Sequence, residues 1–258
     1  MHGFYNNGNT CYFNSAIQCL ISVKNMSEHI LSTDYNGECK FTMMYRELIK
    51  LYYKENKSLK INIFPLLKAF HVAFPRFGTP QPHDAQDAIF CILDILEVSY
   101  PYVKTLFYGE REQETIYPGG KKVFKEPFSM LLLYGKDKES VNALIRDNDK
   151  WHILIDYIDD DGKKHHVAST RTSIIKYPPV LFVSFDKKVR VIADEILNNY
   201  EVSGSIIHIG NQHGGHYISI CKLNDKWILQ DDNNIKLVEF PNEQYHHVLM
   251  YTLKTLPS

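Results

Sequence analysis

The sequence predicts an α+β fold in which a helical half precedes a half rich in β-strands. Apolar residues recur at helical spacing through about the first hundred residues, whereas short β-rich runs separated by turns begin near Phe128. At 258 residues, with no linker rich in proline, serine or glycine, the chain suits a single domain. Because one half follows the other along the chain, a cleft is expected where the two lobes meet.

Four helices are expected in the first half. The first begins near Cys11 with Thr10 as its cap, and the second covers Phe41 to Tyr53. The third follows Ile63-Phe64-Pro65, where proline suits the first turn of a helix. The fourth follows Asp84, whose side chain is of the type that caps helix N-termini.

The second half is expected to form short strands. The turn Leu223-Asn224-Asp225 lies between Tyr217–Cys221 and Trp227–Leu229, which predicts a β-hairpin. The expected strands cover Phe128 to Leu133, His152 to Ile158, Val180 to Phe185, Val189 to Ile192, Ser205 to Ile209, Tyr217 to Lys222 and Lys226 to Gln230.

Composition excludes several classes of function. The formal net charge is −1, which argues against a nucleic-acid partner, and no apolar stretch approaches the length of a membrane span. The N-terminus has no secretory signal pattern. Five cysteines without a Cys-x-x-Cys pair argue against both a disulfide framework and a structural zinc site. We therefore expect no metal or cofactor, and a monomer in the cytoplasm, with nuclear residence left open.

Cys11 is the candidate nucleophile. It lies where the polar run Asn6-Asn7-Gly8-Asn9-Thr10 meets a helix, and the positive end of a helix favours a thiolate. The alternative is a small buried residue, which is our interpretation of Cys19, in the middle of the apolar helix. Asn6 is a candidate donor to the oxyanion, although asparagine alone is equally typical of a turn.

His216 is the candidate general base. It follows Gly214-Gly215, where the lack of a Cβ would let a backbone or a substrate tail approach closely. His213 competes for the role, but it precedes the glycines and is expected in a loop, whereas His216 begins a strand that would hold it rigidly. A metal site formed by His208, His213 and His216 is less favoured, because no carboxylate or thiolate has suitable spacing around them.

Asp231 and Asp232 are the candidate acids. They end the strand that should pair with the His216 strand, where a carboxylate could accept from the second imidazole nitrogen. Alternation along a strand lets only one of them face His216, and spacing does not decide which. The alternative is turn chemistry, because Asp231-Asp232-Asn233-Asn234 is a typical loop sequence.

These segments resemble the ubiquitin-specific proteases, which are papain-like cysteine deubiquitinases. Residues 3–20 are similar to the cysteine box of that family, and His213-Gly214-Gly215-His216-Tyr217 with Trp227 to Asp232 resembles its histidine box and following acid. The helix start His83-Asp84-Ala85-Gln86-Asp87 resembles the second box, with Asp87 where the family usually has Glu. The motifs occur in family order and span residues 3 to about 252.

The resemblance implies a thiol hydrolase that cuts after the C-terminal glycine of ubiquitin, acting on ubiquitin and ubiquitinated proteins. It implies Cys11 as nucleophile, His216 as base, Asp231 as third catalytic residue, Asp232 as its assistant or substitute, and Asn6 as oxyanion donor. The acids would hold the arginine-bearing tail of ubiquitin, and Tyr217 would pack along it. The implied tail-binding residues are Asp84, Gln86, Asp87, Gly215 and Tyr217.

It also implies a papain-like fold with a helical thumb lobe over residues 1–105 and a β-rich palm over 106–258. Many members bind zinc in a β "fingers" region through two Cys-x-x-Cys pairs, which this chain lacks, so we expect short or metal-free fingers. Two other functions stay open: a protease for another ubiquitin-like modifier, and a pseudo-protease that binds ubiquitin without cutting it.

Overall fold

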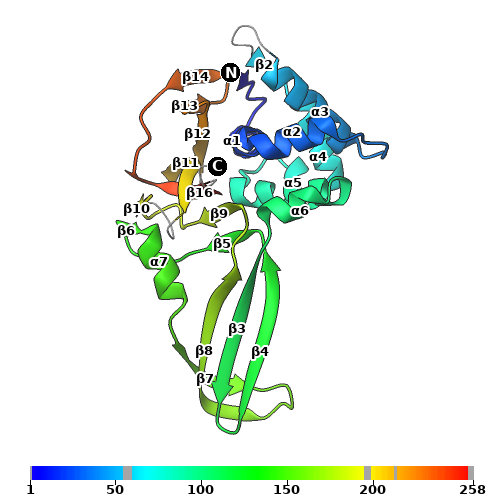
Figure 1. Ribbon diagram of the computed structural model, residues 1–258. Helices are drawn as coiled ribbons and strands as arrows, with labels where there is room; N and C mark the ends of the chain where they lie inside the picture. The colour runs from blue at the N-terminus through cyan, green and yellow to red at the C-terminus, as the bar shows by residue number, and fades with distance from the viewer. Residues whose placement is uncertain (1, 55–59, 195–198, 212–213, 255–258) are drawn as a thin grey trace.

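The computed structural model describes residues 2–54, 60–194, 199–211 and 214–254, which form three connected parts (Figure 1). The thumb lobe comprises residues 2–107, and the palm is a seven-stranded sheet with one flanking helix. A four-stranded finger sheet, formed by 109–128 and 152–176, projects away from both. The fold is therefore α+β, as the sequence predicts.

The thumb lobe is organised around α1, whose twelve residues are all buried. Thr10 is the N-cap residue of α1, as expected, but its hydroxyl donates to Asn6 Oδ1 and makes no capping hydrogen bond to the helix. Asp84 does cap α5 by accepting from the backbone N–H of Gln86. The described elements are β1 (Gly3–Phe4), α1 (Cys11–Ser22), α2 (Lys24–Ser32), α3 (Lys40–Tyr53), β2 (Lys60–Ile61), α4 (Phe64–Ala73), the short 3-10 helix η1 (Pro75–Gly78), α5 (Ala85–Ser99) and α6 (Tyr102–Phe107).

Helical structure continues through α6, slightly beyond the expected boundary at residue 105. Helices α2 and α6 were not among the four expected, because each is short, with 9 and 6 residues. Over the described residues, no helix combines the length and apolar character needed to cross a membrane.

The palm sheet has the strand order β14-β13-β12-β11-β16-β9-β5. The expected hairpin is confirmed: β12 pairs antiparallel with β13, and Asn224 and Asp225 form the turn with positive φ. The described palm elements are β5 (Met130–Leu132), β6 (Glu139–Ser140), α7 (Val141–Asn148), β9 (Val180–Ser184), β10 (Val191–Ile192), β11 (Tyr200–Asn211), β12 (Gly214–Leu223), β13 (Lys226–Asp231), β14 (Asn234–Leu237), β15 (Glu243–Gln244) and β16 (His246–Leu253).

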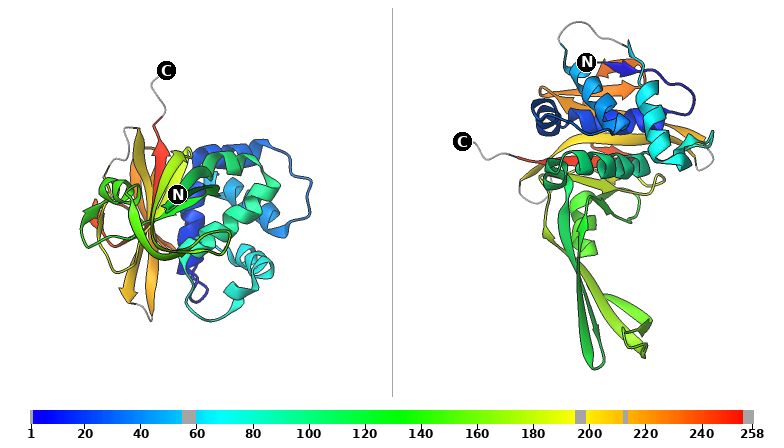
Figure 2. Two further views of the ribbon diagram at one scale, coloured as in Figure 1. Left: turned by 90° about the horizontal axis from the view of Figure 1, so that it is seen from below. Right: turned by 90° about the vertical axis from the view of Figure 1, so that its right-hand side faces the viewer.

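Both faces of the palm sheet carry apolar cores. Phe182 packs into the core shared with the thumb helices, whereas its strand neighbours Leu181 and Val183 pack into a second core with α7. This alternation along β9 places the thumb on one side of the sheet and α7 on the other (Figure 2). The junction between α1 and β12 is consequently buried and rigid, and it carries the candidate site.

The finger sheet has the order β4-β3-β8-β7, formed by β3 (Gly109–Tyr117), β4 (Gly120–Phe128), β7 (His152–Ile158) and β8 (Lys164–Lys176). The β-rich half therefore begins at Gly109, well before the expected start near Phe128. Three of these four strands were missed because their residues are mostly polar and little of the sheet is buried. Figure 2 shows the sheet as an arm extending from the palm.

Candidate active site

Cys11 is the first residue of α1 and lies against β12, the strand that carries His216. Its side chain is 7% exposed. Burial raises the pKa of the Cys11 thiol above its usual value, although backbone N–H groups of Tyr217 and Tyr12 act in the opposite direction. The expected lowering by the helix end is therefore outweighed, and the thiol needs a base.

His216 and Asp231 form a direct pair across the hairpin. The distance from His216 Nε2 to Asp231 Oδ1 is 2.6 Å. Because an ionised carboxylate only accepts, Nε2 carries the proton and Nδ1 keeps a lone pair for a base. No hydrogen bond joins His216 to the Cys11 thiol among the described residues. His213, the competing histidine, lies outside the described residues.

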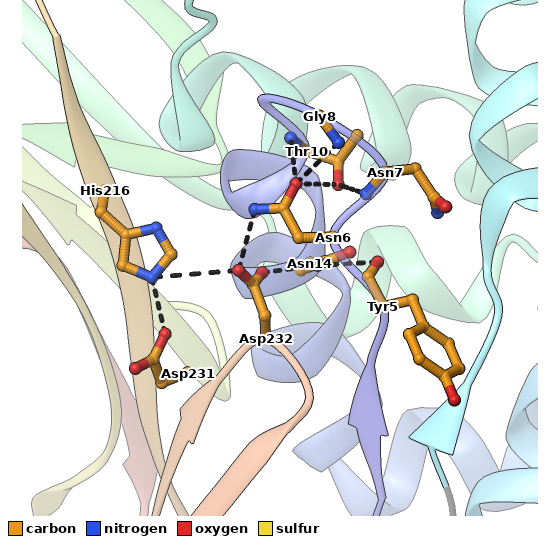
Figure 3. A network of polar contacts seen from close by, with 9 residues as sticks. All are labelled: Tyr5, Asn6, Asn7, Gly8, Thr10, Asn14, His216, Asp231 and Asp232. Atoms are coloured by element: carbon orange, nitrogen blue, oxygen red, sulfur yellow. Dashed lines mark hydrogen bonds and ion pairs between the residues drawn. The ribbon is translucent and has the colours of Figure 1, made fainter.

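Asp232 lies between His216 on one side and Asn6 and Asn14 on the other (Figure 3). Its Oδ2 accepts from Asn6 Nδ2 at 2.8 Å and its Oδ1 from Asn14 Nδ2 at 2.7 Å, while His216 Nε2 is 3.9 Å from Oδ2. The backbone oxygen of Asp232 also accepts from Phe4 N–H at 2.9 Å. The two acids therefore make different contacts: Asp231 holds the imidazole, and Asp232 holds the loop before Cys11.

Asn6 is fixed at both ends of its amide. Its Oδ1 accepts from Gly8 N–H at 2.9 Å, from Thr10 N–H at 3.3 Å and from the Thr10 hydroxyl at 3.1 Å. Its Nδ2 uses one hydrogen on Asp232, which leaves the second N–H available to an oxyanion. The sequence offered Asn6 either as a turn residue or as a donor to the oxyanion. In the structure Asn6 holds the turn through Oδ1 and is still a candidate donor through Nδ2.

A cleft of about 420 Å³ extends from Cys11 between thumb and palm. Asp84 lies in this cleft, but its carboxylate is already bonded to four donors. Burial acts to raise the pKa of Asp84, yet hydrogen bonds from His247 and Lys187 hold it well below its usual range. The cleft is lined by Asn9, Cys11, Tyr12, Arg76, Phe77, Pro82, His83, Asp84, Asp87, Lys187, His208, Gly214, Gly215 and Tyr217.

Of the other four expected tail-binding residues, Tyr217 lines the cleft, and the remaining three differ in availability. Asp87 lines the cleft and makes no hydrogen bond to another described residue. Gln86 does not line it, because its Oε1 accepts from the Ser184 hydroxyl. Gly215 lines the cleft, but a Cβ there would lie 2.3 Å from His208 Nε2, so the close approach it permits is that of the His208 ring.

Sequence reasoning missed the roles of Lys187 and His247, which contact Asp84 from the loop after β9 and from β16. Both are distant from Asp84 in the chain, and β16 was not predicted, so no local signal identified them.

One group in the described part of the chain has the ligand types for a metal ion. The donor atoms of His216, Asp231 and Asp232 lie within 4.8 Å of one another. Asp232, however, faces two amide N–H groups, which suit a carboxylate and would repel a cation. The arrangement favours a hydrogen-bonded triad and not a metal centre.

Comparison with known proteins places this chain in a family. The sequence profile described as "Ubiquitin carboxyl-terminal hydrolase" matches residues 2–194 and 187–251. Ubiquitin carboxyl-terminal hydrolase 1 of Arabidopsis thaliana is 32% identical over 100 residues, covering 38% of this chain and 9% of the relative. Ubiquitin carboxyl-terminal hydrolase 15 of Homo sapiens is 33% identical over 101 residues, covering 36% and 10%. The matched part is thus about a tenth of each relative.

A solved structure shares the fold over the whole chain. It is described as the SAGA Ubp8/Sgf11/Sus1/Sgf73 DUB module bound to ubiquitin aldehyde. The matched chain is 19% identical, with a TM-score of 0.79, and the alignment covers 100% of this chain and 70% of that chain. At this identity the likeness establishes the architecture.

Proposed function

This chain belongs to the ubiquitin carboxyl-terminal hydrolase family, and from that premise we propose that it is a thiol-dependent deubiquitinase. It hydrolyses the peptide or isopeptide bond after the C-terminal glycine of ubiquitin. The observation that carries the proposal is the placement of Cys11 at the start of α1 beside the strand that holds the His216–Asp231 pair. The motif resemblance and the relatives' printed names support ubiquitin as the modifier.

The first chemical step is proton transfer from Cys11 Sγ to His216 Nδ1, because Nε2 is held by Asp231. The ring must approach the thiol for this transfer, and catalytic hydrogen bonds commonly tighten only once substrate is bound. The thiolate then attacks the glycine carbonyl carbon and forms a tetrahedral oxyanion. The free N–H of the Asn6 amide and backbone N–H groups at the start of α1 stabilise that charge.

The protonated His216 next gives its proton to the departing lysine amine, and the carbonyl re-forms as a thioester on Cys11. A water molecule replaces the amine. His216 takes a proton from this water, the resulting hydroxide attacks the thioester, and free ubiquitin leaves as the thiol is restored. Asp231 stabilises the imidazolium in both halves of the reaction.

The cleft offers an acid and two glycines to an extended basic tail that ends in glycines. Asp87 is available to a guanidinium, while Tyr217 and the two glycines line the route toward Cys11. The tail of ubiquitin, Leu-Arg-Leu-Arg-Gly-Gly, meets these requirements, because only glycine can pass a narrow slot beside the nucleophile.

The test is cleavage of a C-terminal fluorogenic ubiquitin by the purified protein, beside the same label on other ubiquitin-like modifiers. Cys11→Ala should abolish release of the fluorophore while leaving ubiquitin binding largely intact. Cys39→Ala, which removes a half-buried thiol at the start of α3, is the matched control and should keep full activity.

Three results would contradict the proposal. Undiminished cleavage by Cys11→Ala would exclude Cys11 as nucleophile. Release from another modifier and not from ubiquitin would keep the chemistry and change the substrate. Binding of ubiquitin by the wild-type protein without any release would identify a pseudo-protease.

A further inference from the structure

The Asp84 carboxylate has no vacant acceptor position in the free protein. Its Oδ1 accepts from His247 Nε2 at 2.7 Å and from Gln86 N–H at 2.8 Å. Its Oδ2 accepts from Lys187 Nζ at 2.6 Å and from the Tyr217 hydroxyl at 3.3 Å. Two donors on each oxygen use the lone pairs that a carboxylate offers. A cationic group arriving from the cleft must therefore displace one of the four.

Three of these donors are fixed by the fold. The Gln86 N–H belongs to the first turn of α5. The His247 ring is buried and is also bonded through Nδ1 to the Phe185 carbonyl at 3.0 Å. Tyr217 is buried on β12. None of them can leave without disturbing the thumb–palm junction.

Lys187 is different in kind. Its side chain is 32% exposed, it comes from the loop after β9, and its ammonium ends a flexible four-carbon stem. The ammonium lies 5.1 Å from the centroid of the Tyr217 ring, so an acid and an aromatic face hold it together. An acid beside an aromatic face is also a suitable site for a guanidinium.

We propose that Lys187 is a built-in competitor for the acidic subsite of the cleft, which occupies Asp84 in the free enzyme and yields to a tail arginine. The inference rests on the proposed function, since it concerns how the same cleft receives its substrate. Exchange of one cation for another leaves Asp84 neutralised before and after binding. The half-buried acid then keeps a cation on Oδ2 before and after binding, at the expense of affinity for the tail.

The two acids of the cleft consequently act differently. Asp87 accepts a guanidinium directly, whereas Asp84 accepts one only after Lys187 has moved into solvent. Arg76, the other cation in the cleft, interacts electrostatically with Asp87. Its guanidinium also contacts Cys91 Sγ at 3.3 Å and lies over the Phe77 ring, so it does not occupy Asp84.

The test compares Lys187→Met with Lys188→Met in steady-state cleavage of fluorogenic ubiquitin. Methionine keeps an apolar stem but removes the competing charge. Lys188 is the matched control, because it is exposed on the same loop and makes no ion pair with another described residue. Lys187→Met should lower KM about two- to fivefold, the range expected of a partly exposed ion pair, with kcat unchanged. Lys188→Met should change neither.

A second arm identifies the competing group. Ubiquitin in which each tail arginine is replaced by glutamine in turn is assayed with both variants. The gain from Lys187→Met should disappear with one of the two substrates, because that substrate no longer brings a cation to Asp84. Binding of ubiquitin to the Cys11→Ala protein, with and without Lys187→Met, should show the same ratio in Kd.

An unchanged or raised KM for a folded Lys187→Met protein would overturn the inference, since it would make Lys187 indifferent or helpful to the tail. A gain that persists with both arginine-substituted substrates would also overturn it. Failure of the wild-type protein to bind or cleave ubiquitin would instead refute the proposed function, so the two failures are distinguishable. Thermal melting of each variant verifies folding.

Discussion

Different interactions stabilise the thumb–palm junction and the finger sheet: the junction has buried hydrogen bonds, whereas the finger sheet has exposed side chains and surface ion pairs. At the junction, the buried Gln230 amide donates to Gln18 Oε1 at 2.8 Å and to the Tyr52 hydroxyl at 3.0 Å, and its oxygen accepts from Ser219. In the finger sheet, Ile153 is 73% and Ile155 is 71% exposed.

Ion pairs at the finger surface, such as Lys121–Glu114 at 2.6 Å, supplement the pairing of its strands. A buried polar group left without a partner costs about 1–3 kcal/mol, whereas exposed ion pairs contribute about 0–1 kcal/mol. The junction therefore tolerates little change, which suits a site where atoms must be placed to within about 0.5 Å. Substitutions in the finger sheet are expected to cost less stability.

Breaking the junction at its catalytic end should give the largest effect. Asp231→Asn should lower kcat by about two to four orders of magnitude, because an amide cannot fix the imidazole with the proton on Nε2. Asp232→Ala should lower kcat by about two orders, because Asn6 and Asn14 lose their acceptor and the oxyanion donor is no longer held. Steady-state kinetics with fluorogenic ubiquitin measures both.

A double-mutant cycle distinguishes these roles. If Asp232 acts through Asn6, adding Asn6→Ala to Asp232→Ala should cost little more, whereas adding it to Asp231→Asn should multiply the two losses. Independent losses in both pairs would show that Asp232 acts by another route.

The next effect concerns stability and pH. The His246 side chain is fully buried in the palm, where Nε2 faces the Pro241 carbonyl at 3.0 Å and Nδ1 contacts the Ser205 hydroxyl at 2.7 Å. Burial lowers the pKa of His246 to about 4. In the unfolded chain a histidine titrates near 6.5. As the pH falls, the unfolded state therefore binds a proton before the folded state does. The contribution of His246 to the free energy of unfolding is complete above about pH 6.5 and is lost progressively toward pH 4.

The expected loss is about 3 kcal/mol of unfolding free energy between pH 7 and 4, measured by urea denaturation. His246→Gln should flatten that part of the profile. The matched control is His166→Gln in the finger sheet, where the side chain is 88% exposed; it should leave the profile within about 0.5 kcal/mol of wild type. An unaltered slope in His246→Gln would assign the acid sensitivity elsewhere.

The smallest effect tests the finger sheet directly. Ile155→Ala should change the free energy of unfolding by less than about 0.5 kcal/mol, because most of the side chain is already in water. Ile17→Ala in α1 removes a fully buried side chain and should cost about 2–5 kcal/mol. If urea denaturation gives comparable losses of unfolding free energy for Ile155→Ala and Ile17→Ala, the finger sheet is as sensitive to substitution as the junction.

Local sequence signals predicted the parts that bury apolar faces. Helix α5 was expected from its periodicity and from Asp84, which does cap it, and the β12–β13 hairpin was expected from its turn. Strand β3 was missed because its sequence, Gly-Glu-Arg-Glu-Gln-Glu-Thr-Ile-Tyr, shows little alternation between apolar and polar residues. It is a strand because it pairs with β4 on one side and β8 on the other, and the sequence of β3 itself does not indicate this pairing.

The site shows the same division. The types and spacing of Cys11, His216 and the two acids could be recognised in the sequence, and their motifs follow the order of a known family. Spacing alone could not assign the different roles of Asp231 and Asp232, because alternation says only that the two side chains diverge; only the family resemblance implied an assignment. The saturation of Asp84 by Lys187 and His247 could not be predicted either, since it depends on tertiary contacts between remote segments.

The contacts of Asp232 have a consequence for the order in which the molecule is built. Its partners Asn6 and Asn14 precede it by 226 and 218 positions, so the chain must be synthesised through Asp232 before these hydrogen bonds can form. Closing so long a loop is entropically costly, and such contacts tend to form late in folding. The thumb helices, whose own backbone hydrogen bonds join residues close in the chain, can form earlier. In a nascent chain, Cys11 is therefore synthesised long before the candidate active site can assemble, because that site also needs the segments that hold His216, Asp231 and Asp232.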